Sequence, residues 1–182
     1  MQEKRFPTKS RRGSVQQRLY FPEVNIHLGV AALLAVILQV GAIFGPFGDE
    51  DLPRRVLFVA SYILLLGFVG ANIRRPGIII LGIGIICNFL AIVANGGLMP
   101  TTAEAYGKNG EIAADVRPGD WIPHSKDVLL DRSDVNLYFL ADHFTNGGDV
   151  IRVFSIGDVI IAAGLIVTAA ALLTPRVRPN SA

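Results

Sequence analysis

Residues 78–94 read Ile-Ile-Ile-Leu-Gly-Ile-Gly-Ile-Ile-Cys-Asn-Phe-Leu-Ala-Ile-Val-Ala, an apolar run of 17 residues with a single strongly polar side chain, Asn88. A helix needs about 20 mostly apolar residues to cross a bilayer, with a usual range of about 17 to 25. Three further runs are comparable, at 28–44, 56–71 and 156–174. A soluble chain of 182 residues is too short to enclose four such helices, so the sequence predicts helices that span a membrane.

The predicted fold class is an all-α integral membrane bundle of four transmembrane helices with a structured extracytoplasmic loop. We place the helices near residues 26–45, 55–72, 77–95 and 155–174, and the loop at 96–154. Residues 1–25 would form a basic cytoplasmic arm and residues 175–182 a cytoplasmic tail. Within the loop, Thr101 and Glu104 have the spacing of a capping box, which predicts a short helix ending near Tyr106.

Basic residues are segregated along the chain. The arm, the link between the second and third runs, and the tail together carry ten Lys and Arg residues against two acids. The loops on the opposite side carry twelve acids against seven bases. Because Lys and Arg bias a loop toward the cytoplasm, both termini are expected to be cytoplasmic. Arg54 and Arg55 are a local exception beside the three acids at 49–51.

Two short motifs flank the long loop. The segment Asn95-Gly96-Gly97-Leu98-Met99-Pro100 is typical of a helix end, because Asn or Gly adopts the left-handed backbone that closes a last turn. The segment Ser155-Ile156-Gly157-Asp158 has the spacing of a capping box at the start of the last helix. Intramembrane carboxylates are also candidates for function. The alternative is therefore that both motifs meet at the outer ends of the third and fourth helices and bind a ligand beside Asp158.

Polar and small residues inside the runs predict contacts between helices. Asn88 is expected to bond to a neighbouring helix, with Gln39 and Tyr62 as partners. Small residues spaced four apart let helix backbones approach closely, and such pairs are Gly41/Gly45, Gly67/Ala71 and Gly164/Thr168.

The histidines give weak signals. His27 is a candidate at the membrane interface, where it is expected to be solvated rather than to ligate a pigment or haem. Asp142 and His143 are adjacent in the outer loop and, with His124, are the remaining candidates for a metal or acid–base site. The spacing of these residues does not match a known metal motif, so we predict no metal site and no catalytic residue.

The two flanking motifs resemble those of an uncharacterised group of bacterial multi-pass membrane proteins, recorded as a domain of unknown function. In that group a Phe-Leu-Gly-Asp-like segment lies between the motifs, and here it reads Phe139-Leu140-Ala141-Asp142. The resemblance covers about residues 28–174 and implies a bacterial inner-membrane location. It names no activity and no cofactor. The candidate residues for a ligand or partner site are Asn88, Asn95, Gly96, Gly97, Met99, Pro100, Asp142, Ser155, Gly157 and Asp158.

Two classes of function remain open from the sequence. The first is an accessory or scaffold subunit of a larger bacterial membrane complex, with lipid and protein partners but no nucleic acid. The second is a binder or carrier of a small membrane ligand (a lipid, a quinone or a cation) at the outer ends of the third and fourth helices. An enzyme is not expected, because the sequence has no recognisable nucleophile or metal set.

Overall fold

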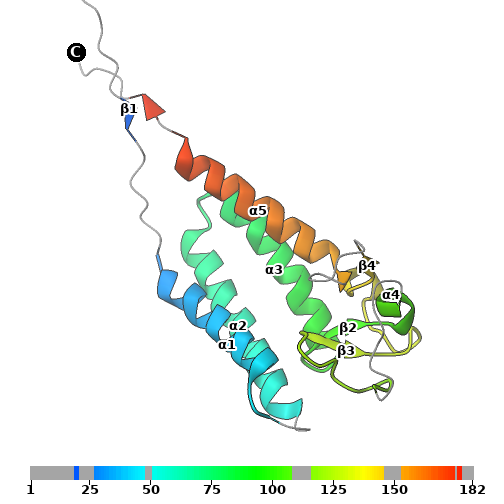
Figure 1. Ribbon diagram of the computed structural model, residues 1–182. Helices are drawn as coiled ribbons and strands as arrows, with labels where there is room; N and C mark the ends of the chain where they lie inside the picture. The colour runs from blue at the N-terminus through cyan, green and yellow to red at the C-terminus, as the bar shows by residue number, and fades with distance from the viewer. Residues whose placement is uncertain are drawn as a thin grey trace, which may run out of the picture.

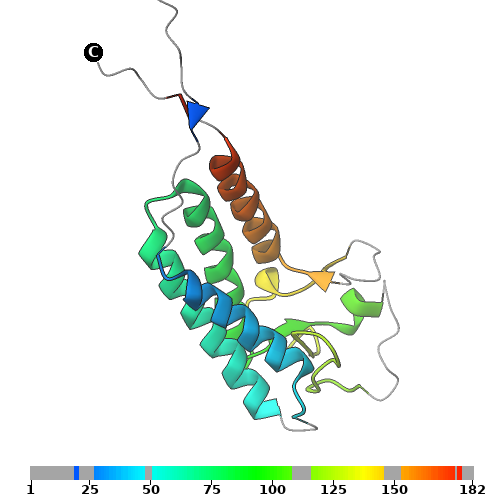
Figure 2. The same cartoon turned by 60° about the vertical axis from the view of Figure 1, so that its left-hand side comes forward.

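Four long helices dominate the computed structural model, which describes residues 19–20, 27–47, 51–107, 116–145, 153–174 and 176–177. They are α1 (Gly29–Phe44), α2 (Asp51–Asn72), α3 (Pro76–Ala94) and α5 (Ile156–Leu173). Helix α1 packs against α2, α2 against α3, and α3 against α5, so the helices follow one another around the bundle in chain order (Figures 1 and 2).

Three of these helices are long and apolar enough to cross a membrane, namely α2, α3 and α5. Their presence indicates a membrane protein and confirms the coarse prediction. Helix α1 is equally apolar but has only 16 residues. At a rise of about 1.5 Å per residue it is roughly 24 Å long, which is shorter than the bilayer core of about 30 Å. The fourth span therefore stays a prediction.

A short strand before α1 pairs with a short strand after α5. Strand β1 (Leu19–Tyr20) pairs antiparallel with β6 (Arg176–Val177), beyond the end of the bundle where α5 finishes (Figure 1). Most of the predicted arm and tail lie outside the described residues. The pairing places the segment before α1 and the segment after α5 at the same end of the helices, as four antiparallel helices require.

The described chain is mostly helical, as predicted, but the loop between α3 and α5 also contains short strands. Strand β2 (Met99–Thr101) pairs parallel with β3 (Asp127–Leu129), and Thr101 bridges to Asp142 on its other side. Strands β4 (Phe144–Thr145) and β5 (Val153–Phe154) form a second small pair. The remaining elements are α4 (Ala103–Gly107) and the 3-10 turn η1 (Tyr138–Leu140).

The predicted capping box in this loop is wrong by one residue. The hydroxyl of Thr102, rather than that of Thr101, accepts from the amide of Ala105 at the start of α4. The Thr101 hydroxyl instead donates to the Asp142 carbonyl at 2.7 Å. Thr101 belongs to β2 and pairs with Leu129 on one side and Asp142 on the other. The helix therefore begins later than the local pattern predicts.

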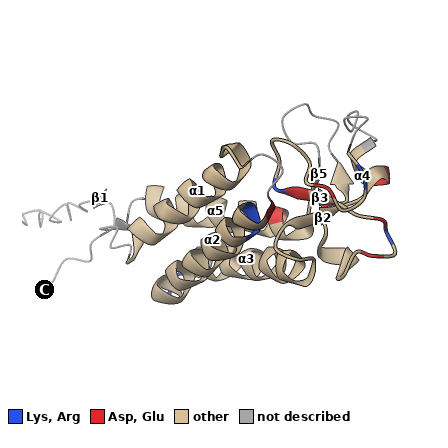
Figure 3. Ribbon diagram, turned by 90° about the horizontal axis from the view of Figure 1, so that it is seen from below, with Lys and Arg blue, Asp and Glu red and all other residues tan. Residues whose placement is uncertain are grey.

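The loop packs onto the helix bundle as part of one core. Leu98, Met99 and Val128 are buried in the same apolar cluster as Phe58 of α2 and Ile85 of α3. Charged residues collect in the loop and at the helix ends, while the helix shafts are almost free of them (Figure 3). The prediction that the loop is structured is therefore confirmed for its described residues, and its position outside the cytoplasm stays a prediction.

Glycines bring α3 and α5 into close contact. A Cβ atom on Gly84 would lie 2.6 Å from the carbonyl oxygen of Gly157, and one on Gly164 would overlap the backbone of Leu81. Thr168 lies against Gly77 in the same seam. Of the three predicted small-residue pairs, only Gly164/Thr168 is thus shown at a helix interface, because Gly41 and Gly67 have open space around them.

Candidate functional site

A long apolar groove runs between α1 and α5, because the helices pack in the order α1-α2-α3-α5 and leave this side open. Its volume is about 870 Å³. Helices α1, α2, α3 and α5 all supply walls, represented by Val36, Leu65, Ile85 and Leu165. Gln39 and Tyr62 add uncharged polar groups. The charged lining residues, among those that the structure describes, are Lys126 and Asp158.

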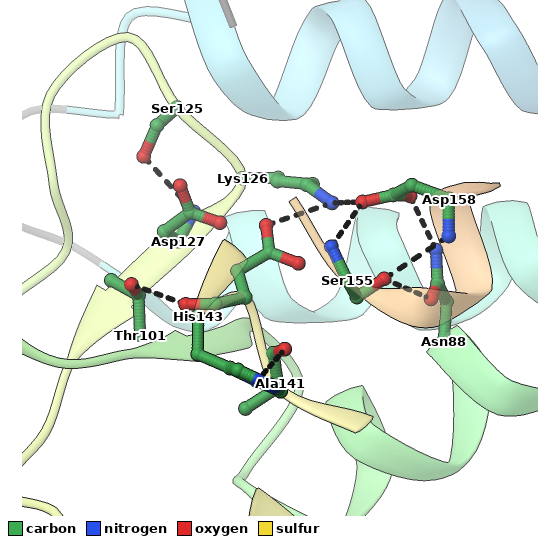
Figure 4. A network of polar contacts seen from close by, with 10 residues as sticks. Asn88, Thr101, Ser125, Lys126, Asp127, Ala141, His143, Ser155 and Asp158 are labelled. Atoms are coloured by element: carbon green, nitrogen blue, oxygen red, sulfur yellow. Dashed lines mark hydrogen bonds and ion pairs between the residues drawn. The ribbon is translucent and has the colours of Figure 1, made fainter. Parts of the chain in front are cut away.

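Lys126 is the centre of a charged cluster at the end of this groove (Figure 4). Its Nζ atom lies 2.9 Å from Oδ2 of Asp158 and 3.0 Å from Oδ2 of Asp142. Asp142 is completely buried, whereas the side chains of Lys126 and Asp158 remain 27% and 30% exposed. The ion pair of Lys126 and Asp158 is therefore the part of the cluster that a groove occupant can reach.

Three residues hold Asp158 at the start of α5, namely Lys126, Ser155 and Asn88. The Ser155 hydroxyl accepts from the Asp158 amide and the Asp158 carboxylate accepts from the Ser155 amide, both at 3.1 Å. This reciprocal pair confirms the predicted capping box. The third partner is Asn88 of α3, whose Nδ2 donates to Oδ1 of Asp158 at 2.7 Å (Figure 4).

Asn88 bonds to a neighbouring helix, as predicted, but its main partners lie on α5. Besides contacting Asp158, its Oδ1 accepts from the Ser155 hydroxyl at 2.8 Å. Of the two predicted partners, Gln39 donates to Ser61 instead. Gly157 makes this geometry possible, because a Cβ atom there would overlap the Asn88 side chain.

Strand β2 positions the two loop residues of the cluster through its backbone. The Met99 amide donates to the Lys126 carbonyl at 3.1 Å, and the Asp142 amide donates to the Pro100 carbonyl at 3.0 Å. Met99 and Pro100 are themselves fully buried. The second half of the Asn95–Pro100 motif therefore holds Lys126 on one side and Asp142 on the other.

The first half of that motif does not reach Asp158. Asn95 donates to the carbonyls of Ala91 and Asn136 and accepts from the Asn136 amide, so it joins the end of α3 to the loop. Gly96 and Gly97 have φ values of 77° and 101°, the left-handed geometry expected of a helix end. The Gly96 carbonyl accepts from Arg55 at 2.8 Å, and neither residue lines the groove.

Arg54 and Arg55, the local exception to the charge pattern, both form ion pairs at the N-terminal end of α2. Arg54 is buried with its guanidinium 3.8 Å from the centre of the Trp121 ring, and it pairs with Asp51 at 3.6 Å. Arg55 pairs with Asp51 at 3.4 Å. The local acid and the aromatic ring thus offset these positive charges.

A second carboxyl group, Asp127, lies behind the cluster. It is 4% exposed, and the Asp142 carboxyl group acts on it electrostatically. Burial and the neighbouring Asp142 carboxylate raise the pKa of Asp127 well above its usual range, against the opposing effect of Lys126. Asp127 therefore favours its protonated form.

The same interactions act on Lys126 and Asp142. Burial would lower the pKa of Lys126, but the three carboxyl groups of Asp142, Asp158 and Asp127 outweigh it and raise that pKa well above its usual value. Burial raises the pKa of Asp142, although Lys126 opposes the shift. Lys126 therefore carries a positive charge at neutral pH, and it forms ion pairs with the carboxylates of Asp142 and Asp158 at the end of the groove.

The histidine candidates lie elsewhere. The His27 side chain is exposed, and its backbone is tied to Asn72 of α2. His124 stacks on Phe44, and His143 lies between Tyr138 and Phe144 with Nδ1 2.9 Å from the Ala141 carbonyl. Among the described residues no group of His, Cys, Asp and Glu side chains has a geometry that could hold a metal ion.

Two members of the cluster, Lys126 and Asp127, were missed by the sequence interpretation. The signal that could have found them is their position directly before the apolar stretch Val128–Leu130. A charged pair that enters a buried strand carries its charges into the core and needs partners there. Asn88, Asp142, Ser155, Gly157 and Asp158 were predicted, and the structure brings these five together with Lys126.

The comparison with known families agrees with the motif resemblance. The model of a family of unknown function, DUF5317, matches residues 23–170. No curated protein and no solved structure matches the chain.

Proposed function

The chain belongs to the family of unknown function DUF5317, and from that premise we propose that it binds or carries a small amphiphilic membrane ligand in the groove between α1 and α5. The observation that carries this proposal is the groove itself, with about 870 Å³ of space, apolar walls and one charged end. Ligand pockets typically enclose about 300–1,000 Å³ and combine apolar walls with a few placed polar groups.

The walls favour a ligand with a hydrocarbon or isoprenoid tail. Such a tail would lie along Val36, Leu65 and Leu165, and the head group would reach Lys126 and Asp158. A lipid or a quinone has this form. A bare cation is disfavoured, because Lys126 already neutralises Asp158 at 2.9 Å. Binding is favoured over catalysis, because the polar groups at the groove end are bonded to one another.

The second candidate is an accessory or scaffold subunit, and the open side of the groove favours it specifically. Large apolar side chains on both rims are more than half exposed, including Val36 of α1 and Val159 and Leu165 of α5. A transmembrane helix of a partner could occupy the same space. In that case the groove would be an interface, and the protein would be part of a larger membrane complex.

We further propose a bacterial inner-membrane protein with α1 as the fourth span, the loop between α3 and α5 outside, and both termini in the cytoplasm. Three features support this arrangement. The predicted inner side is rich in Lys and Arg, which favours cytoplasmic termini. Helix α1 packs along α2, and the β1–β6 pair joins the segment before α1 to the segment after α5, as four spans require.

The test uses two neighbouring alanines of α5. Ala162 lines the groove and Ala163 does not, although both are exposed. Full-length protein extracted in mild detergent is analysed by native mass spectrometry. The ligand proposal expects a bound small molecule on the wild type and on Ala163→Trp, and its loss from Ala162→Trp, since an indole would fill the groove.

The same sample separates the two candidates. If a stoichiometric protein partner co-purifies with the wild type and is lost only from Ala162→Trp, the groove is an interface and the accessory-subunit proposal replaces the ligand proposal. If the wild type carries neither a ligand nor a partner, and added lipids and quinones do not bind, the groove has no binding function.

A further inference from the structure

The charge balance at the groove end restricts which head group the groove accepts. Lys126 contributes one positive charge, and Asp142 and Asp158 contribute two negative charges within 3.0 Å of it. Asp127 adds a third carboxyl group that is neutral while it holds its proton. The described residues of the cluster therefore have a net charge of −1, or −2 if Asp127 is ionised. In either state, the end of the groove repels an anionic head group.

The negative excess does not create a cation site. Asp158 Oδ1 accepts from Asn88, while Oδ2 accepts from both Lys126 and the Ser155 amide. Asp142 is fully buried behind Lys126. An ammonium head group would meet no accessible carboxylate oxygen without a partner here, and it would lie against the Lys126 ammonium.

The cluster offers a hydrogen-bond donor instead. A lysine ammonium has three N–H donors; among the described residues, Asp158 accepts one at 2.9 Å, and Asp142 lies at an ion-pair distance of 3.0 Å from the same nitrogen. Because the side chain is 27% exposed and lines the groove, a remaining donor can reach an occupant. An uncharged oxygen acceptor in the groove would complete the hydrogen bonding of Lys126 without adding charge.

We propose that the groove selects amphiphiles with an uncharged, carbonyl-bearing head group, and that the Lys126 ammonium donates to that carbonyl while Asp142 and Asp158 exclude anionic lipids. The inference rests on the proposed ligand-binding function and names its substrate class. A quinone ring and a glycerol ester both supply the required carbonyl, so the two sources share one chemistry.

The test is a competition on full-length protein stripped of bound lipid. Four probes are added in equal amounts and bound species are counted by native mass spectrometry. A short-chain benzoquinone and a diacylglycerol are neutral, a phosphatidylglycerol with the same acyl chains is anionic, and a diacyl trimethylammonium lipid is cationic. At least one neutral probe is expected to exceed both charged probes by about tenfold, the ratio for a single repelled charge at the groove end. The ratio of the two neutral probes identifies the source.

Two variants separate charge selection from fit. Asp142→Asn and Asp158→Asn each remove one negative charge, and each is expected to raise the share of phosphatidylglycerol about fivefold or more relative to diacylglycerol. Using both keeps the test valid if one variant does not fold. Asp131→Asn, an exposed loop carboxylate, is the matched control and should leave the ratio unchanged.

The outcomes are distinguishable from failure of the proposed function. If all four probes bind with similar occupancy, or if a charged probe is preferred, the head-group inference is overturned while ligand binding stands. If no probe binds the wild type, and Ala162→Trp behaves like the wild type, the groove is not a ligand site and both proposals fail together.

Discussion

Asp127 shows how strongly one buried side chain depends on its surroundings. Its pKa is raised well above its usual range, first by burial and then by the neighbouring Asp142 carboxyl group. From the unfolded value near 4 up to the raised pKa, the native protein binds one more proton than the unfolded chain. Stability therefore falls as pH rises through this window, by up to about 1.4 kcal/mol per pH unit.

This property gives a prediction for the pH range above the unfolded value near 4. Asp127→Asn removes the titrating carboxyl group, so the pH-dependent loss due to Asp127 should vanish. The melting temperature in detergent, followed against pH, is expected to fall less steeply for Asp127→Asn than for the wild type. Asp131→Asn, on the exposed part of the loop, should keep the wild-type slope. A wild-type slope in Asp127→Asn would show that Asp127 is ionised in the native state.

At the scale of single residues, the sequence predicted those side chains whose role is local. The Ser155 and Asp158 capping box needs only a spacing of three, and it was found from that spacing. Lys126 could not be found in this way, because its partners Asp142 and Asp158 lie 16 and 32 positions away. The β2 backbone, which bonds to both loop segments, brings Lys126 and Asp142 together, and the packing of α5 against α3 adds Asp158.

At the scale of elements, the α3–α5 seam depends on backbone contact. Gly84→Ala would place a methyl group 2.6 Å from the Gly157 carbonyl oxygen and 2.7 Å from the Ile161 amide nitrogen. These are backbone atoms, so rotation of a side chain offers no relief, and the helices must separate. We expect a loss of about 1–3 kcal/mol, seen as a lower melting temperature in detergent.

Gly67→Ala is the matched control for this change. Gly67 lies within α2, and no atom of a neighbouring element comes within 4 Å of the place that a Cβ atom would take there. The added methyl group should be neutral or slightly stabilising, because alanine favours the helix. Equal melting temperatures for Gly84→Ala and Gly67→Ala would mean that α3 and α5 do not pack through their glycines.

The helices were predictable and the short strands were not, for a physical reason. Each helix has a continuous apolar run whose length and ends are visible in the sequence, and three of them match the predicted spans closely. Strands β2 and β3 have three residues each and are buried throughout. They show no alternation of apolar and polar residues, so a local pattern gives no sign of them.

At the scale of the whole molecule, the proposed orientation makes opposite ends of the bundle face opposite compartments. Ser133 is exposed in the outer loop, and Arg74 is exposed in the turn between α2 and α3. In a Cys87→Ala background, Ser133→Cys should react with a membrane-impermeant maleimide on intact spheroplasts. Arg74→Cys should react only after lysis. Labelling of both sites without lysis would contradict the proposed topology, and the reverse pattern would invert it.

The role of β2 has a consequence for how this protein can diversify. Strand β2 is bonded to Lys126 and Asp142 through main-chain hydrogen bonds. These bonds are the same whatever side chains the two positions carry. Framework and chemical selectivity are therefore separable in this chain. Exchanging the charged side chains at 126 and 142 would alter what the groove recognises while the strand, the helix seam and the groove walls keep their places.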